Sequence, residues 1–330
     1  MRDNGDEETT DNGRQERRRL VLNPVSGGGG HAERARRLAE SYGFSIAETD
    51  HAGHGVELAK RAAADGVDLL AVCGGDGTVH EVIQGLVAAE ALDSVTLCVV
   101  PTGTVNFLAD GLGIRGMRHG FKLAESGETR RLDLGIANDE PFVISAVVGV
   151  PAEASASVSS GVKSRLGRLG FVIEGIQKAR SSGGLRVEVD AISEGEEFTW
   201  RGDALSVVAG NLRRFIETNE RANAEDGTLE ITIVEPLSAI DAVVETVKRR
   251  LLHRETSHVT DLESDRLEII GLDDAPVTVS LDGEIRSYET VRISVRPRVL
   301  SVRVGGEYVP RLDRGSGEND ENGPPDDGAA

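Results

Sequence analysis

The chain has 330 residues, of which 38% are hydrophobic and 28% charged, so it is long enough for about two folded domains and too apolar to be disordered throughout. Its formal net charge of −19 and its 3% of aromatic residues argue against nucleic-acid binding, because neither a basic stripe nor stacking side chains are available. No apolar run approaches the roughly 18 residues of a membrane helix and the N-terminus lacks the apolar centre of a signal peptide, so we expect a cytoplasmic protein.

Acidic residues are in excess in this chain, and lysine is scarce among the basic residues. Acidic residues outnumber basic ones by 56 to 37, and only five of the basic residues are lysines. This composition is typical of an acidic surface adapted to concentrated salt, where charges are screened within about 3 Å; an ordinary acidic protein is the alternative. The two cysteines, Cys73 and Cys98, fall in apolar runs, and we expect both to be buried and reduced.

The first third of the chain alternates apolar runs with amphipathic stretches. Residues 1–18 form a polar tail that we expect to be disordered. From 19 to 135, the alternation predicts an α/β nucleotide-binding domain with a mostly parallel sheet. The expected strands cover 19–24, 44–48, 67–72 and 94–101, and the expected helices cover 31–42, 55–65, 78–90 and 117–126.

The rest of the chain is rich in strands. From 136 to 295, short segments alternate apolar and polar residues between turn signals, which predicts an antiparallel, β-sandwich-like domain. Only two stretches, 161–180 and 238–253, have a helical pattern. We expect the segment 296–312 to return to the first domain and residues 313–330 to form a second disordered tail.

Three glycine-rich loops follow three of the predicted parallel strands: NPVSGGGG (23–30), GGDGT (74–78) and PTGTVN (101–106). Open α/β sheets bind ligands at the carboxyl ends of their strands, and glycine lets backbone amides approach a phosphate. None of the loops is a GxxxxGK[ST] or GxGxxG motif. Asp76 lies in the second loop, and an anion beside a phosphate requires a cation such as Mg²⁺ between them.

These loops, in this order, resemble those of the diacylglycerol kinase-like lipid kinases, a group that includes the sphingosine kinases. The matching segments are NPVSGGG, GGDGTVHEVIQGL and PTGTVNFLADGLGI, followed by LDLG (132–135), EDGTLEI (225–231) and LDGE (281–284). The resemblance spans nearly the whole chain except its tails. It implies a nucleotide-binding domain, a second domain for the lipid substrate, ATP as phosphoryl donor, Mg²⁺, and a lipid hydroxyl as acceptor.

The resemblance also implies roles for individual residues. Glu284 would be the general base, and Asp76 would hold the catalytic Mg²⁺ together with Asp133. The nucleotide would be held by Asn23, Ser26, Gly27, Thr49, Gly74, Gly75, Asp76, Gly77, Thr78, Val79, His80, Glu81, Gly103, Thr104 and Asn106. A second, structural Mg²⁺ would be held by Asn223, Asp226 and Thr228.

Several of these residues also have a simpler structural interpretation. Glu284 follows an Asp-Gly hairpin turn, where a solvated carboxylate is ordinary. Asp133 is also consistent with a strand end, and Asp226 with a turn. His51 and His54 could ligate a metal, although a loop role is the simpler expectation.

The chain departs from the family pattern at three positions. His80 replaces a commoner asparagine, Phe107 a common aspartate, and Gly28 a frequent lysine. The last two changes leave a non-catalytic nucleotide-binding regulator as an alternative. An NAD kinase, which shares GGDGT, is another alternative, although the sequence lacks the GSTAY-like segment expected of one.

Two basic segments bear on the lipid partner. The stretch 161–182 carries five basic residues against one acidic residue, and KRRLLHR (248–254) ends a predicted helix. One interpretation is peripheral contact with the anionic inner face of the cell membrane. The other is that both are amphipathic helices covering the β-rich domain. The identity of the lipid acceptor and the oligomeric state, a homodimer included, are left open by the sequence.

Overall fold

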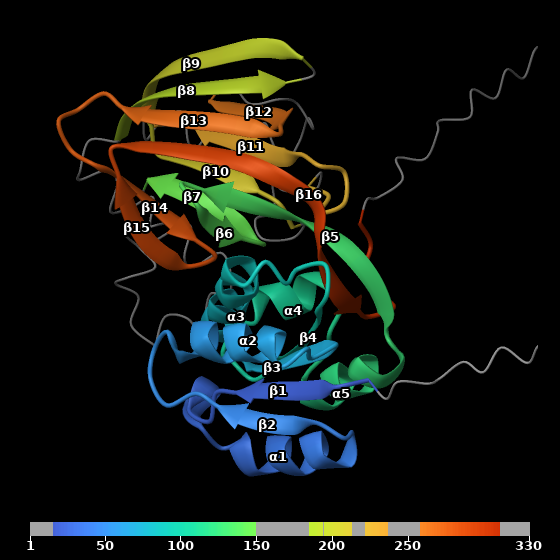
Figure 1. Ribbon diagram of the computed structural model, residues 1–330. Coiled ribbons are helices and arrows are strands. Elements are labelled where there is room, and N and C mark those ends of the chain that lie inside the picture. Colours follow the sequence, from blue (N-terminus) through green and yellow to red (C-terminus); the bar gives the residue numbers. More distant parts are fainter. Residues whose placement is uncertain (1–15, 150–184, 194, 213–221, 237–257, 311–330) are drawn as a thin grey trace, which may run out of the picture.

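The computed structural model describes residues 16–149, 185–193, 195–212, 222–236 and 258–310 (Figure 1). The basic segments 161–182 and 248–254, residues 313–330 and most of 1–18 lie outside the described residues.

The first domain is built on a parallel sheet with strand order β2-β1-β3-β4. Its strands are β1 (Arg18–Leu22), β2 (Ser45–Glu48), β3 (Leu69–Gly74) and β4 (Thr96–Pro101). The central strand β3 is buried along its whole length, as its continuous apolar run predicts.

Helices cover both faces of this sheet (Figure 1). They are α1 (Ala32–Ser41), α2 (His54–Ala64), α3 (Asp76–Ala88) and α5 (Met117–Ser126), with a short α4 (Phe107–Gly111) and the 3₁₀ turn η1 (Ser26–Gly28) in the loops. Successive strand residues alternate between the faces, so Leu22 and Cys73 pack with α1 and α5, whereas Val21 and Val72 pack with α2 and α3. The predicted α/β domain is therefore confirmed.

The second domain consists of two antiparallel layers around one apolar core. A six-stranded sheet has the order β12-β11-β10-β7-β14-β15. Its strands are β7 (Ser145–Gly149), β10 (Ser206–Gly210), β11 (Leu229–Val234), β12 (Val259–Ser264), β14 (Val277–Leu281) and β15 (Glu284–Tyr288). The facing layer contains β8 (Leu185–Ser193), β9 (Glu196–Ala204) and β13 (Arg266–Gly271), and the inward side chains of both layers form the core. This arrangement confirms the expected sandwich-like domain.

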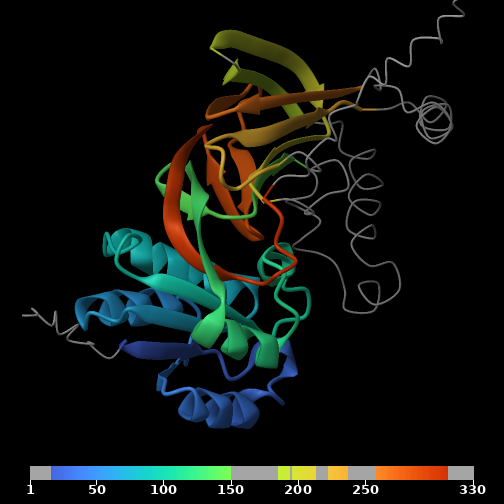
Figure 2. The same cartoon turned by 90° about the vertical axis from the view of Figure 1, so that its right-hand side faces the viewer.

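Two long strands run through both domains (Figure 2). They are β5 (Glu128–Ala137), which continues into β6 (Glu140–Phe142), and β16 (Thr290–Val304). β16 pairs with β13 through residues 290–294 and with β4 through Val302, so one sheet of ten strands extends from the first domain into the second. The domain boundaries expected at 135 and 295 therefore fall inside β5 and β16.

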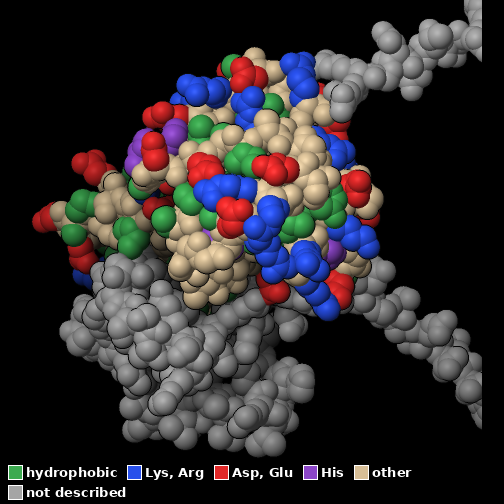
Figure 3. Space-filling model, turned by 90° about the horizontal axis from the view of Figure 1, so that it is seen from below, with side chains coloured by type: hydrophobic (Ala, Val, Ile, Leu, Met, Phe, Trp, Pro, Cys, Tyr) green, Lys and Arg blue, Asp and Glu red, His purple; other side chains and the backbone are tan. Residues whose placement is uncertain are grey.

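The face seen from below Figure 1 carries basic and acidic side chains close together (Figure 3). Ion pairs such as Arg19–Asp65 and Arg36–Glu48, each 2.7 Å, are examples from the first domain. Such exposed pairs contribute little to stability individually. Among the residues that the structure describes, no helix has the length and apolar character needed to span a membrane.

Both cysteines are unpaired and fully buried, which gives a test of the packing of the first domain. Burial raises the pKa of each thiol to about 12. Because the thiolate is the reactive form, we expect neither Cys73 nor Cys98 to react with Ellman's reagent in the folded protein at neutral pH, and both to react in guanidinium. Rapid labelling of either thiol before unfolding would contradict this packing.

Candidate active site

The three glycine-rich loops meet at the carboxyl edge of the parallel sheet. Their strands are in register there, because Leu22 pairs with Cys73 and Gly74 pairs with Pro101. The Asn23 side-chain amide donates a hydrogen bond to Thr78 Oγ1 at 2.9 Å, which joins the first loop to the second. Residues far apart in sequence therefore form one surface of loops.

Glycine is required where the loops touch. A Cβ on Gly103 would lie 2.6 Å from the Cα of Gly75, so these two loops approach backbone to backbone. Gly27 has a φ of +54°, and a Cβ there would lie 2.0 Å from the carbonyl oxygen of Thr102. Ser26 Oγ lies 2.7 Å from Thr102 Oγ1. This close approach leaves the loop backbone exposed to a ligand at the same edge.

Asp76 begins α3 and binds the start of α4. Its two carboxylate oxygens each accept one backbone hydrogen bond at 3.0 Å, from the amides of Phe107 and Leu108. Burial raises the pKa of this carboxyl group, these amides oppose the rise, and the negative charge of Asp282 adds to it. Both oxygens keep a lone pair that a cation could use. Asp76 thus has a structural role that the sequence did not reveal.

Three other candidate nucleotide-binding residues, Val79, Glu81 and Thr49, make contacts within the fold. Val79 is buried in the core that α2 and α3 form with the sheet. Glu81 accepts hydrogen bonds from the amides of Gly53 and Gly55 at 2.8 and 3.0 Å. Thr49 is buried and donates its amide to Leu22. The structure gives Val79 and Glu81 roles in the fold, while Gly75 and Gly77 remain partly exposed.

The third loop is shaped by Asn106. Its side chain accepts a hydrogen bond from the Gly103 amide and donates one to the Gly103 carbonyl, both at 2.8 Å. Asn106 itself adopts a left-handed φ of +57°, which asparagine tolerates better than most residues. Thr104, at the tip that this bond pair closes, is exposed.

Glu284 reaches this edge from the second domain. A Cβ on Gly77 would lie only 3.5 Å from Glu284 Oε1, so the carboxylate lies against the first turn of α3. Glu284 is exposed and begins β15 directly after the turn at Asp282 and Gly283. The chain therefore brings the LDGE and GGDGT motifs into contact.

Asp282 is the functional residue that the sequence analysis missed. Its side chain is 5% exposed, and its carboxylate accepts hydrogen bonds of 2.8, 2.8 and 3.0 Å from the amides of Val143, Ile144 and Ser145. The same carboxylate lies 3.4 Å from Nδ1 of His80, which is 3% exposed. The LDGE motif contained the signal, but the Asp-Gly pair was interpreted only as a hairpin turn.

A second set of contacts ties the same hairpin to α3. Glu140, on β6, accepts hydrogen bonds from Arg286 Nε at 2.8 Å and from the Tyr288 hydroxyl at 3.1 Å. Gln84 of α3 donates to the same carboxylate at 3.3 Å. Glu140 therefore links the strand that carries Glu284 to α3 through β6.

Asp133, on β5, binds backbone amides of two other segments. It is completely buried, and its carboxylate accepts hydrogen bonds of 2.7 Å from the amides of Gly227 and Arg298. Burial raises the pKa of this carboxyl group, and nearby Asp226 raises it further. The structure thus brings Asp133 to the EDGT turn and to the bulge in β16, whereas Asp76 binds α4.

The EDGT turn contains the residues implied as a structural Mg²⁺ site. Asp226 is exposed, and its Oδ1 accepts hydrogen bonds from the amide and the hydroxyl of Thr228 at 3.0 and 2.9 Å. Asn223 Oδ1 accepts one from the amide of Glu225 at 3.1 Å. The three residues are together, but these bonds account for the turn without a metal.

A hollow of about 390 Å³ lies beside the first loop. Its lining includes Gly27, Gly30, Thr102 and the side chains of His31 and Arg34. The volume is within the range of ligand pockets, and Arg34 supplies a positive charge near the position where Gly28 replaces the lysine of related sequences. The hollow places a guanidinium at the same edge as the glycine loops.

Comparison with known proteins agrees with this geometry. Residues 17–137 match the diacylglycerol kinase catalytic domain. Lipid kinase YegS of Escherichia coli (strain K12) is 27% identical over 292 residues, covering 86% of this chain and 95% of that protein. "Probable lipid kinase YegS-like" of Enterobacter sp. (strain 638) is 28% identical over 294 residues with the same coverage.

A solved structure shares the fold. The crystal structure of a diacylglycerol kinase from Bacillus anthracis str. Sterne superposes with a TM-score of 0.69 at 23% identity, covering 89% of this chain and 98% of that one. The comparisons thus show that residues 17–137 match the diacylglycerol kinase catalytic domain, that the chain is similar to lipid kinases over 86% of its length, and that it shares its fold with a diacylglycerol kinase.

Proposed function

We propose that this protein transfers the γ-phosphoryl group of ATP to the hydroxyl group of a lipid, with Mg²⁺ bound at Asp76. One observation carries the proposal: Glu284 Oε1 lies against Gly77, so a carboxylate of the second domain meets the nucleotide loops of the first. A phosphoryl donor and an acceptor hydroxyl can meet only where both domains contribute to one site.

The loop edge supplies the phosphate side of the reaction. Phosphoryl transfer depends mainly on positioning and on stabilising negative charge. The partly exposed backbone at Gly75 and Gly77, at the N-terminus of α3, offers amides to an anion, and Arg34 adds a guanidinium beside the first loop. These groups replace the lysine that the loops lack.

Asp76 fits a role as a cation ligand. Its carboxyl group is buried enough for its pKa to be raised, and a bound cation would stabilise the ionised form. Mg²⁺ held there would neutralise negative charge on the triphosphate. Asp133 accepts amide hydrogen bonds from Gly227 and Arg298 and, unlike Asp76, is completely buried, so we assign it to holding β16 and the EDGT turn.

Glu284 is suited to accept the proton of the attacking hydroxyl. It is exposed, so an acceptor can approach it, and it lies at the turn that would hold the donor phosphates. The Asp282 carboxylate positions it by holding the preceding turn on three amides, and His80 extends this contact to α3. Proton removal and phosphate binding are thus fixed relative to each other.

The acceptor class follows from the family. We propose a lipid alcohol presented at the surface of a membrane, such as a diacylglycerol, a sphingoid base or an ether-lipid alcohol. Peripheral membrane contact is part of this proposal, because a lipid alcohol of this kind is held in a bilayer.

Incubation of the purified protein with labelled ATP and a total lipid extract tests the function. We expect a phosphorylated lipid that requires Mg²⁺ and is identified by mass spectrometry. A parallel reaction with NAD as sole acceptor distinguishes an NAD kinase, which would form NADP without lipid. Binding of ATP without transfer to either acceptor would instead indicate a nucleotide-binding regulator.

Replacement of the proposed base gives a residue-level test. Glu284→Gln keeps the size of the side chain but cannot accept the proton, and we expect kcat to fall by about 10²- to 10⁴-fold with little change in ATP binding. Glu289→Gln, an exposed glutamate just beyond the same strand, serves as a matched control and should retain activity. Equal rates for the two variants would remove Glu284 from the mechanism.

Asp76 is expected to affect both rate and stability. Asp76→Ala removes the cation ligand and should lower kcat by at least ~10²-fold. It also leaves the amides of Phe107 and Leu108 without their partner, at a cost of about 1–3 kcal/mol for each buried group. Asp76→Asn keeps an acceptor for one amide, so urea unfolding should show a smaller loss of stability while kcat stays low. A nearly wild-type rate for Asp76→Asn would contradict the assignment.

A further inference from the structure

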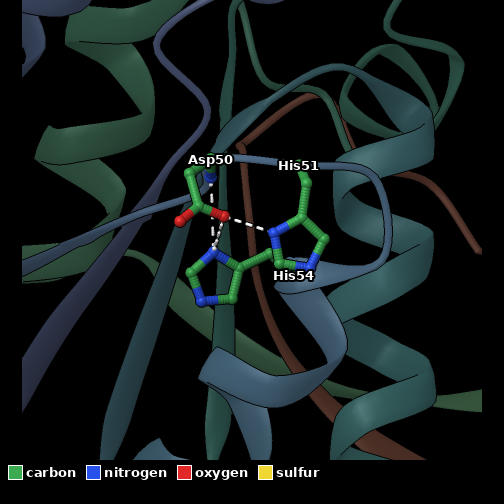
Figure 4. Close-up of side chains that lie close together, drawn as sticks. All are labelled: Asp50, His51 and His54. Atoms are coloured by element: carbon green, nitrogen blue, oxygen red, sulfur yellow. Dashed lines mark hydrogen bonds and ion pairs between the residues drawn. The ribbon is translucent and has the colours of Figure 1, made fainter.

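A loop next to the nucleotide edge gathers three metal-ligating side chains (Figure 4). Asp50 and His51 lie between β2 and α2, His54 is the first residue of α2, and one ligand atom from each falls within 4.8 Å of the other two. The sequence drew attention to the two histidines but not to Asp50. The fold is what turns the carboxylate toward both rings.

The three side chains converge on one point. Nδ1 of His54 lies 2.8 Å from Asp50 Oδ1, and Nδ1 of His51 contacts the same oxygen. The two imidazole rings stack with centroids 4.8 Å apart and planes 9° apart, so their Nδ1 edges face the carboxylate together (Figure 4). This convergence requires neither histidine to leave its loop.

The His54 ring also presents a lone pair. The backbone amide of Asp50 lies 3.3 Å from His54 Nδ1 and donates to it, which in that arrangement makes Nδ1 an acceptor. Nδ1 is the atom that faces Asp50 Oδ1. In that arrangement no proton lies between His54 Nδ1 and Asp50 Oδ1, which are 2.8 Å apart, so a cation that displaces the amide from Nδ1 could bind both atoms.

Hydrogen bonds to α3 hold this loop in place. Glu81 accepts hydrogen bonds from the amides of Gly53 and Gly55, on either side of His54. Gly53 has a φ of +85°, a conformation that lets the chain turn sharply into α2. The backbone that carries the three ligands is therefore held in place before any ion binds.

The donor set selects the class of ion. Two imidazole nitrogens and one carboxylate oxygen suit Zn²⁺ and similar transition metals, whereas Mg²⁺ prefers oxygen ligands and water. Zinc bonds of about 2.0–2.2 Å would need ligand atoms slightly farther apart than the 2.8 Å between His54 Nδ1 and Asp50 Oδ1, a small rotation of exposed side chains. Asp50 and His51 are 74% and 58% exposed, so water can complete the coordination.

We propose that Asp50, His51 and His54 bind one transition-metal cation of the Zn²⁺ class, at a site separate from the Mg²⁺ of phosphoryl transfer. Because Glu81 joins the loop to the helix that begins at Asp76, the ion would brace the start of α2 against α3. Binding of the ion does not depend on the proposed kinase activity.

Calorimetric titration of the metal-stripped full chain with Zn²⁺, in excess Mg²⁺, tests the site. We expect one equivalent to bind the wild type, and His51→Ala/His54→Ala to weaken that binding by at least ~10-fold. His258→Ala, which removes a partly exposed histidine on the second domain, is the matched control and should bind like the wild type. Wild-type binding by the double variant, or no binding by the wild type, would overturn the proposal.

A spectroscopic measurement tests which atoms bind. Co²⁺ in a site with two imidazoles should give visible absorption bands that the double variant lacks. Asp50→Asn keeps an oxygen for the histidine contacts but removes the charge, so it should remain folded by circular dichroism and bind Co²⁺ at least ~10-fold more weakly. Unchanged bands in Asp50→Asn and in the double variant would place the ion elsewhere.

Discussion

The arrangement of the site depends on the hydrogen bonds that the Asp282 carboxylate accepts. This carboxylate accepts hydrogen bonds from three consecutive amides, at Val143, Ile144 and Ser145, and it lies against the buried ring of His80. A buried carboxylate is costly unless such donors surround it, so this position tolerates few alternative structures. Through this one side chain, the hairpin that carries Glu284 is fixed to both β7 and α3.

The same principle recurs elsewhere in the molecule. Asp76 accepts hydrogen bonds from the amides that begin α4. Asp133 accepts hydrogen bonds from an amide of the EDGT turn and from an amide at the bulge in β16. In each case a carboxylate ties together chain segments that are distant in sequence. Acidic residues of the motifs therefore serve the fold directly. Both oxygens of each carboxylate accept a backbone amide, but Asp76 is partly exposed at the loop edge, whereas Asp133 is completely buried.

The sheet that runs through both domains fixes the positions of the two domains relative to each other. β16 pairs with β13 in the second domain and with β4 in the first, and β5 accompanies it along both. Two long strands resist a change in the angle between the domains better than a flexible linker would. Glu140 adds a second attachment by holding Arg286 and Tyr288 beside Gln84 of α3. The position of Glu284 beside Gly77 rests on these long-range pairings.

The sequence by itself determined the local elements and the class of enzyme. Apolar runs, helical spacing and glycine loops are local signals, so the parallel sheet, the sandwich-like second domain and the family motifs were all predictable from them. The tertiary structure alone decided which carboxylates bind backbone and which face the site, because those bonds join segments such as Asp282 to Val143. It also decided that Asp133 lies near Asp226, and that Asp50 joins the two histidines. Neither periodicity nor spacing contains these distances, since they arise only when strands from both ends of the chain pair in one sheet.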